Sequence, residues 1–466
     1  MERNIRRPHN WEAFSVIVFL LVSIIVGFVV FKINISILLL ISSAYTMLIG
    51  KRCGYTWKEM EGAVIEKISS TISALFILLG IGFLISTWMF SGTIPYIVYY
   101  LIGIINPSFV PLCAFIICSV VSVIIGTSYG TAGTVGVIMI GIAQAMGIPL
   151  AITAGAVVSG SYLGQVISPV ADMPNLTAPM GDVELYENIK HALYVVVPSL
   201  VICCIAYLII GSSTGMSADL SNVMEVKQGI AEIFAIHPAA LLPLVFLFFS
   251  SFKKLPVAPS LFVSGTIAII VGVITNGFTW IAGLNCAYEG FSLSMTNANP
   301  DNVSVIITSL VTRGGINSMG STLVLVFCAF AFAGVSTKIK VLDVIAEQTL
   351  GNVHSVAGLT ISTVITTVIA AMATANAYLT AIVPIELLKE KYVEAGLHPV
   401  NLVRTNQVSG AILIPLIPWA AAGAYMSGVM NMPTVSYLPY AFFCWGTAIV
   451  AIILSLFKIG IRPLKK

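Results

Sequence analysis

Long apolar runs, separated by short breaks rich in polar residues, glycine or proline, make up almost the whole chain. A helix needs about 20 apolar residues to cross a hydrocarbon core of ~30 Å, and several runs reach this length whereas others are too short to cross alone. The pattern therefore predicts roughly ten to thirteen helical crossings. The runs are Trp11–Phe31, Ile33–Ile49, Ile68–Phe90, Val110–Ile125, Val135–Met146, Leu150–Gly164, Ala192–Ile210, Pro238–Phe252, Pro256–Ile274, Thr322–Val335, Val356–Ala371, Tyr378–Leu388, Val408–Met430 and Tyr437–Phe457.

The composition agrees with this pattern. Of the 466 residues, 58% are hydrophobic and only 9% are charged, and the mean hydropathy is +1.01. These values exclude a soluble globular protein and a disordered chain. We expect an all-α polytopic membrane protein that forms a single transmembrane domain over residues 1–466, with a first half of about 1–212 and a second half of about 232–466.

Basic residues gather at three places outside the apolar runs. Lys and Arg are enriched in the cytoplasmic loops of membrane proteins, so this distribution predicts that both termini and the loop 51–67 face the cytoplasm. Two cytoplasmic termini imply an even number of crossings. The basic residues are Arg3, Arg6 and Arg7 before the first run, Lys51, Arg52, Lys58 and Lys67 after the second, and Lys458, Arg462, Lys465 and Lys466 at the end of the chain.

One carboxylate, Asp172, lies in the polar segment 168–175, which interrupts the apolar pattern and contains two prolines. An acidic side chain at membrane depth is costly, and it is retained mainly where it faces a protein interior or a water-filled path. Irregular backbone is tolerated at the same kind of place. Because hard cations prefer oxygen ligands, we expect Asp172 to bind transported sodium, with Ser168, Asn175 and the nearby Gln165 as partners. The alternative is a helix cap at the membrane surface.

The stretch 126–136 has the highest density of glycine and threonine in the chain. The hydroxyls of Thr127 and Ser128, together with carbonyls exposed at a helix break, could coordinate a dehydrated cation. Close packing of helices through small residues explains the glycines equally well, but it does not explain the group of hydroxyls. Both interpretations stay open at this point.

The second half of the chain echoes these breaks at a spacing of 246 residues (410 − 164). A glycine followed five residues later by a proline occurs at 164–169 and again at 410–415, and the stretch 126–131 has a counterpart at 372–377. Paired interruptions in two halves of a membrane protein point to a transporter's binding site, so we expect these breaks to face one another. The second half adds four candidate site residues: Thr374, Asn376, Ser409 and Trp419.

Five motifs, in order along nearly the whole chain, carry a family resemblance. They are Gly126–Gly136, Gly160–Asn175, Arg313–Met319, Pro415–Ser427 and Tyr437–Phe443. The sequence resembles the NhaC-type sodium/proton antiporter family, which also includes malate/lactate antiporters. The resemblance implies an α-helical antiporter with two related halves, which exchanges sodium for protons or couples these ions to an organic acid.

The chain departs from the family pattern at charged positions. Gln165, Gln407 and Val408 stand where the family carries acidic residues, and two alanines after Trp419 replace a polar pair. Asp172 is therefore the only acid left in the matched core. One carboxylate still allows one-for-one exchange of sodium and a proton, whereas the vacated space would suit a larger, less polar solute.

These features predict a secondary active transporter of the plasma membrane, with sodium/proton antiport by alternating access as the leading function. The alternative is a sodium- or proton-coupled transporter or exchanger of a small organic acid or amino acid, and a channel is a third class. The sequence has neither a phosphate-binding loop nor a hydrolase-type catalytic pattern, so we expect no enzyme and no cofactor beyond transported sodium and protons. The expected partners are the lipid bilayer, these ions and, under the alternative, an organic solute, but not nucleic acid. The sequence does not fix the oligomeric state.

Overall fold

A computed structural model describes residues 5–213, 220–253, 255–296, 303, 305–349 and 355–464. Within these ranges the chain is helical, and a single isolated bridge between Leu397 and Pro463 is the only β-type pairing. Arg3, Lys465 and Lys466, on which the predicted orientation partly rests, lie outside the described residues. The same holds for 214–219, at the predicted boundary between the halves, so that boundary stays a prediction.

The helices range in length from four residues in α6 to 34 in α3, and most are separated by glycine, proline or a polar cap. In the first half they are α1 (Asn10–Val22), α2 (Ile35–Arg52), α3 (Trp57–Phe90), α4 (Thr93–Leu101), α5 (Val110–Ile125), α6 (Ser128–Thr131), α7 (Val137–Ala145), α8 (Leu150–Ile167), α9 (Asp172–Met180) and α10 (Leu185–Ser213). α11 (Leu220–Ile233) lies mostly between the two predicted halves. In the second half the helices are α12 (Leu242–Phe252), α13 (Val257–Asn276), α14 (Trp280–Glu289), α15 (Val305–Val311), α16 (Gly320–Lys338), α17 (Val341–Thr349), α18 (Val356–Thr374), α19 (Ala377–Glu394), α20 (Val400–Asn406), α21 (Ala421–Met430), α22 (Thr434–Tyr437) and α23 (Phe442–Leu456). Three π-helical segments extend or join these helices, at Ser23–Val30, Ala132–Gly136 and Gln407–Ala411.

Among the described residues, eight helices are long and apolar enough to cross a membrane, and the number rises to 12 if each of four bent pairs is one span. The prediction of an all-α polytopic membrane protein is therefore confirmed. One bent pair joins Val400–Leu416 to Ala421–Met430 at an angle of 51°. This break explains why the long apolar run 408–430 is not one straight helix.

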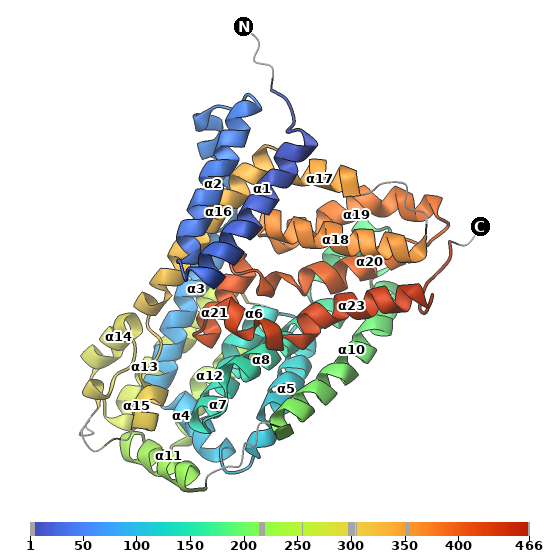
Figure 1. The fold of residues 1–466 in the computed structure, drawn as a ribbon. Coiled ribbons are helices and arrows are strands. Elements are labelled where there is room, and N and C mark those ends of the chain that lie inside the picture. Colours follow the sequence, from blue (N-terminus) through green and yellow to red (C-terminus); the bar gives the residue numbers. More distant parts are fainter. Residues whose placement is uncertain are drawn as a thin grey trace.

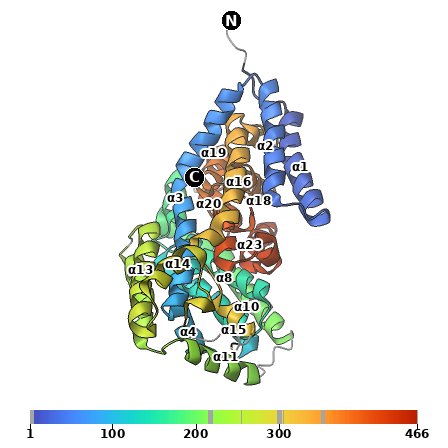
Figure 2. The same ribbon diagram turned by 90° about the vertical axis from the view of Figure 1, so that its left-hand side faces the viewer.

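Helices of the two halves pack against each other along the length of the molecule (Figure 1). The second-half helix α16 packs along α2 and α3, and α23 packs against α8 and α10. Figure 2 shows α16 beside α2 and α3 from a second direction. The largest buried apolar cluster runs from Ala13 to Ala451, so both halves contribute to one continuous core.

Small residues allow α5 and α8 to approach closely. A Cβ added to Gly160 would lie 2.5 Å from the carbonyl oxygen of Phe115, and one added to Gly164 would lie 2.2 Å from that of Ser122. The N–H of Gly164 also donates to the Ser122 hydroxyl at 3.0 Å. The packing interpretation therefore holds for these two glycines, and the contact fixes the end of α8 that carries Gln165.

Candidate ion-binding site

The break after α5 is a left-handed turn followed by an extended residue. Gly126 ends α5 at φ 80° and ψ 9°, a conformation that glycine adopts without steric penalty. Thr127 is extended, at φ −130° and ψ 126°, and its hydroxyl accepts from the N–H of Gly130 at 3.2 Å. Thr127 thus caps α6, and Ser128 is the first residue of that helix.

The break after α8 places the carboxylate at a helix start. Ser168 is extended, at φ −78° and ψ 126°, and the N–H of Ala171 donates to its carbonyl at 3.2 Å. Ala171, at φ −75° and ψ 149°, precedes Asp172, which is the first residue of α9. The partial positive charge of a helix N-terminus stabilises a carboxylate at this position.

The second half repeats the first of these breaks. Ala375 ends α18 in the left-handed region, at φ 51° and ψ 25°, as Gly126 ends α5. Asn376 then adopts φ −133° and ψ 125°, close to the values of Thr127, and its side chain caps α19. The two breaks are 249 residues apart (375 − 126).

The second break recurs at the same spacing. Ile417 is extended, at φ −94° and ψ 109°, and Ala420, at φ −78° and ψ 148°, precedes α21. The N–H of Ala420 donates to the carbonyl of Ile417 at 3.0 Å, as Ala171 donates to Ser168. Both pairs of breaks therefore match at 249 residues, and the predicted spacing of 246 is wrong by three, because it aligned residue types rather than backbone conformations.

The breaks surround a cavity of about 330 Å³. Asp172, Thr127, Ser128, Gln165 and Asn376 line it, so the structure brings together five of the ten predicted site residues. Seven pairs of lining residues are spaced by 249: Thr127 with Asn376, Ser128 with Ala377, Tyr129 with Tyr378, Tyr162 with Ala411, Gln165 with Ile414, Asp172 with Ala421, and Met173 with Ala422. The cavity therefore lies where corresponding parts of the two halves meet.

The cavity wall presents one charge among oxygen-bearing side chains. Asp172 is the only charged residue among the described residues that line it, and Tyr378 lines the same cavity. The Nε2 of Gln165 donates to the Ser128 hydroxyl at 3.3 Å, while its Oε1 is buried without a partner among the residues described. Carboxylate, hydroxyl and amide oxygens are the ligands that hard cations prefer.

Asn376 is less available as a ligand than its position suggests. Its Oδ1 accepts from the backbone N–H groups of Tyr378 and Leu379, at 2.9 and 3.1 Å. An amide oxygen has two lone pairs, so both are engaged in capping α19. The structure therefore gives Asn376 a role in holding the break, with its side chain at the cavity wall.

A second cavity, of about 210 Å³, adjoins the first. Thr127, Asp172 and Val257 line both cavities. Ser250 and Ser251, in the last turn of α12, line the second one, which thus reaches the connection between α12 and α13. Asp172 is an exposed residue that lines this second cavity, rather than one enclosed in the apolar core.

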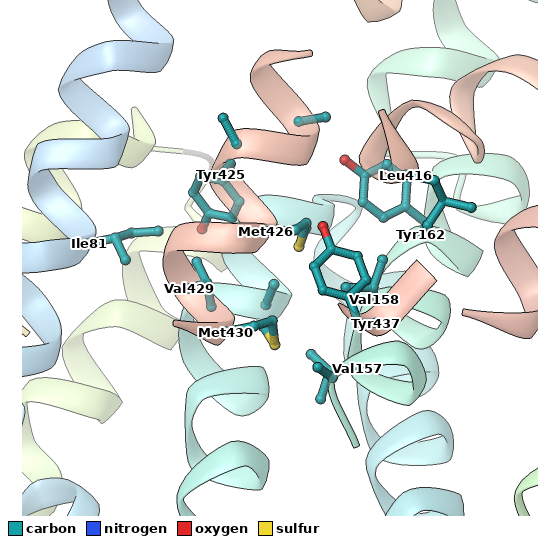
Figure 3. Close-up of a cluster of buried hydrophobic side chains, with 14 of the residues drawn as sticks. Ile81, Val157, Val158, Tyr162, Leu416, Tyr425, Met426, Val429, Met430 and Tyr437 are labelled. Carbon is teal, nitrogen blue, oxygen red and sulfur yellow. The ribbon is translucent and has the colours of Figure 1, made fainter. Parts of the chain in front are cut away.

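A packed layer separates the first cavity from a third one, of about 340 Å³, at the other end of α21. Tyr425 stacks on Tyr129, with ring centroids 4.1 Å apart and planes inclined by 14°, and its hydroxyl donates to the carbonyl of Tyr129. Figure 3 shows this layer, with Ile81, Met426, Val429 and Met430 around Tyr425. The start of α21 lines the first cavity and its last turn lines the third, so α21 spans the closed region between them.

The other five predicted site residues do not line the first cavity. Each donates a side-chain hydrogen bond to a backbone carbonyl at 2.6 to 2.9 Å: Ser168 to Val123, Asn175 to Ala171, Thr374 to Ala370, Ser409 to Thr405 and Trp419 to Met372. Ser168 and Trp419 bond carbonyls near the C-terminal ends of α5 and α18. The other three side chains bond the carbonyl four residues earlier in their own helical segment. The geometry supports a structural role for these five side chains.

Sequence reasoning missed the tyrosines of the wall. Tyr129 and Tyr378 are equivalent at the 249-residue spacing, and Tyr162 lies on α8 facing the same cavity. Each lies in or beside an apolar run, where tyrosine is common for reasons of packing. The signal that could have identified Tyr129 and Tyr378 is that each follows the capping residue of a break by two positions.

Paired helix breaks, one carboxylate between them and a closed layer on one side define a polytopic secondary transporter. The profile of the Na+/H+ antiporter family matches residues 11–174 and 160–459. This chain belongs to the Na+/H+ antiporter family, which confirms the predicted resemblance.

Several relatives align along nearly their full length. An uncharacterized Na+/H+ antiporter of Haemophilus influenzae is 38% identical over 467 residues, covering 99% of this chain and 98% of that protein. The malate-2H+/Na+-lactate antiporter of Bacillus subtilis is 32% identical, covering 96% of this chain and 95% of that protein. The Na+/H+ antiporter NhaC of Bacillus subtilis is 30% identical, covering 87% of this chain and 88% of that protein.

Proposed function

We propose that this protein exchanges sodium for protons across the plasma membrane by alternating access, with Asp172 as the group that binds either ion. The observation that carries the proposal is the position of Asp172, a single carboxylate in a polar cavity where the breaks of the two halves meet. Membership of the Na+/H+ antiporter family supports ion exchange. The protein acts as a transporter rather than an enzyme and uses no cofactor beyond the transported ions.

The chemistry of one carboxylate is sufficient for antiport. Deprotonated Asp172 attracts sodium, and protonation removes that charge, so the two ions exclude each other. The hydroxyl of Ser128 and the unpaired Oε1 of Gln165 are the oxygens best placed to replace part of the sodium hydration shell. Release of one ion is then required before the other binds, and this requirement couples the two fluxes.

The cavities support alternating access. Asp172 lines the second cavity, which reaches the α12–α13 connection, while the layer around Tyr129 and Tyr425 closes the path along α21. Opening this layer and closing the opposite route would expose the same carboxylate to the third cavity. Rigid movement of one helix group against another around a fixed site is the usual way in which transporters with repeated halves achieve this.

Exchange of an organic solute is the other class of function. One aligned relative is named as a malate-2H+/Na+-lactate antiporter, and the cavity of about 330 Å³ has room for more than an ion. Two of the aligned relatives are named Na+/H+ antiporters, as is the family, so ion exchange is favoured.

We also propose that both termini face the cytoplasm. The support is the basic character of the described end segments, where Arg6 and Arg7 precede α1 and Lys458 and Arg462 follow α23. A single cysteine added at either end should react with an impermeant maleimide only after cells are lysed. Labelling in intact cells would contradict this orientation.

The test of function uses purified protein in liposomes that contain a pH-sensitive dye. A pulse of external sodium should make the lumen more alkaline without any organic solute present. Asp172→Asn keeps the side-chain shape and removes the charge, so it should abolish the signal. Wild-type rates in this variant would exclude Asp172, and a signal that requires an added organic acid would favour solute exchange.

Asp182→Asn is the matched control. Asp182 carries the same functional group ten residues later, where it is exposed and pairs with Lys389. Its backbone is left-handed, at φ 53°, a conformation that asparagine tolerates. Exposed ion pairs contribute little to stability, so this variant should keep wild-type transport.

A further inference from the structure

We infer that the exchange is electroneutral, with one sodium moved for one proton, and that the position of Ala421 sets this stoichiometry. The inference rests on the proposed sodium/proton exchange and adds its charge balance. Its basis is that the second half repeats the position of Asp172 and places an alanine there.

Ala421 is equivalent to Asp172 in backbone geometry as well as in spacing. Each is the first residue of a helix, α21 with ten residues and α9 with nine. The preceding residues, Ala420 and Ala171, differ by 3° in φ and 1° in ψ (−78° and 148° against −75° and 149°). Both Ala421 and Asp172 line the first cavity. The fold therefore provides two corresponding positions for an acid, and this chain fills one.

The charge inventory of the site is correspondingly small. Apart from Asp172, the described residues lining the first two cavities are neutral. Lys67 is buried one turn before Ser70 on α3, but it does not line either cavity. Arg404, on α20, is buried and donates to the carbonyl of Gly460, and it lines neither cavity. Asp172 is thus the one charge that a transported ion can neutralise at the site.

One carboxylate gives the loaded site the same charge in both directions. With sodium bound, or with a proton bound, the Asp172 site is neutral. The empty site carries a full negative charge, and enclosing that charge in an apolar layer is costly, so movement of the empty site is slow. A complete cycle therefore moves one sodium against one proton and no net charge. A second carboxylate at the equivalent position would allow two protons to exchange for one sodium, with one net charge per cycle.

The test measures the balance point of the two gradients in proteoliposomes, with the membrane potential held at zero by valinomycin and equal potassium. With a proton gradient of about tenfold, net flux through a one-for-one exchanger stops when the sodium gradient is also about tenfold. Net flux through an exchanger of two protons per sodium stops only at a sodium gradient of about a hundredfold. We expect balance near tenfold for the wild type. We also expect a potassium diffusion potential to leave that point unchanged, because no net charge crosses the potential.

Variants at Ala421 connect the stoichiometry to the structure. Ala421→Asp should move the balance point toward a hundredfold and make it depend on potential, and Ala421→Asn, which adds similar bulk without charge, should keep it near tenfold. A wild-type balance point near a hundredfold, or one that shifts with potential, would overturn the inference while leaving sodium/proton exchange intact. The same would follow if Ala421→Asp exchanged ions with the wild-type balance. Absence of any sodium-driven pH change would instead overturn the proposed function.

Discussion

The close contact between α5 and α8 should make Gly164→Ala damaging to both stability and transport. A Cβ at Gly164 would lie 2.2 Å from the carbonyl oxygen of Ser122, 2.3 Å from its carbonyl carbon and 2.3 Å from its hydroxyl. Two of these atoms belong to the backbone and cannot rotate away. Because favourable contacts need about 3.5 Å, the helices would have to separate by roughly 1 Å at this level.

Two energetic costs and one smaller gain combine in this variant. Overpacking of a tight contact costs about 1–3 kcal/mol, and loss of the 3.0 Å bond from the Gly164 N–H to the Ser122 hydroxyl costs about 1 kcal/mol more. Replacing glycine by alanine within a helix returns roughly 0.5–1 kcal/mol. The free energy of unfolding should therefore fall by about 1–3 kcal/mol. Since Gln165 is the next residue, its 3.3 Å contact with Ser128 in the cavity wall should lengthen as well.

Unfolding in a sodium dodecyl sulfate titration measures the first effect, and sodium-driven pH change per folded protein measures the second. We expect the initial rate to fall about tenfold, which corresponds to roughly 1.4 kcal/mol lost at the site. Gly446→Ala on α23 is the control, because nothing lies within 4 Å of the added Cβ. Wild-type stability in Gly164→Ala would refute the close approach of α5 and α8.

Two further predictions separate supporting residues from ion ligands. Ser168→Ala removes a buried bond of 2.7 Å to a backbone carbonyl, so the free energy of unfolding should fall by about 0.5–1.5 kcal/mol. The sodium concentration that gives half-maximal transport should also shift less from the wild-type value in Ser168→Ala than in Ser128→Ala, when both variants are measured in the same liposomes. Glu12 is fully buried and accepts from both terminal nitrogens of Arg6, at 2.6 and 2.8 Å. Glu12→Gln should cost about 1.5–3 kcal/mol and expose the N-terminal segment to trypsin, detected by mass spectrometry, whereas transport per folded protein should stay unchanged.

The sequence was sufficient to predict the all-α membrane-spanning class and the helix breaks, and it placed Asp172 at one of these breaks. That Asp172 binds sodium stays a prediction. Apolar runs of membrane length are required by the bilayer, and glycine or proline marks where a helix must end. The spacing between the halves could not be predicted, because the left-handed residue is Gly126 in one half and Ala375 in the other. Equivalent backbone conformations thus carry unrelated residues, and alignment by residue type moved the match by three positions.

The direction of each polar side chain was also beyond the sequence. A serine or threonine near a helix break can face the cavity, as Ser128 does, or bond a carbonyl, as Ser168 and Thr374 do. Either arrangement gives the hydroxyl a hydrogen-bond partner, and the rotation of the helix after the break decides which of the two forms. Tyr378 and Asp172 line the same cavity although they are about 200 residues apart in the chain, so their proximity required the folded structure.

The repeated breaks show that the geometry of the site does not depend on its charge. The break before α21 forms with Ile417 and Ala421 in the positions of Ser168 and Asp172, with nearly the same backbone angles. The helix ends and turns therefore hold the cavity open, and the carboxylate is present for the ion. Neutralising Asp172 should remove the favourable interaction of its charge with the helix N-terminus, worth about 0.3–1 kcal/mol. It should also lower the cost of removing this side chain from water, and this gain offsets part of the loss. Asp172→Asn should thus unfold within about 1 kcal/mol of the wild type in the detergent titration while losing transport. A larger loss of stability would mean that the charge supports the fold, and the loss of transport could then no longer be assigned to ion binding.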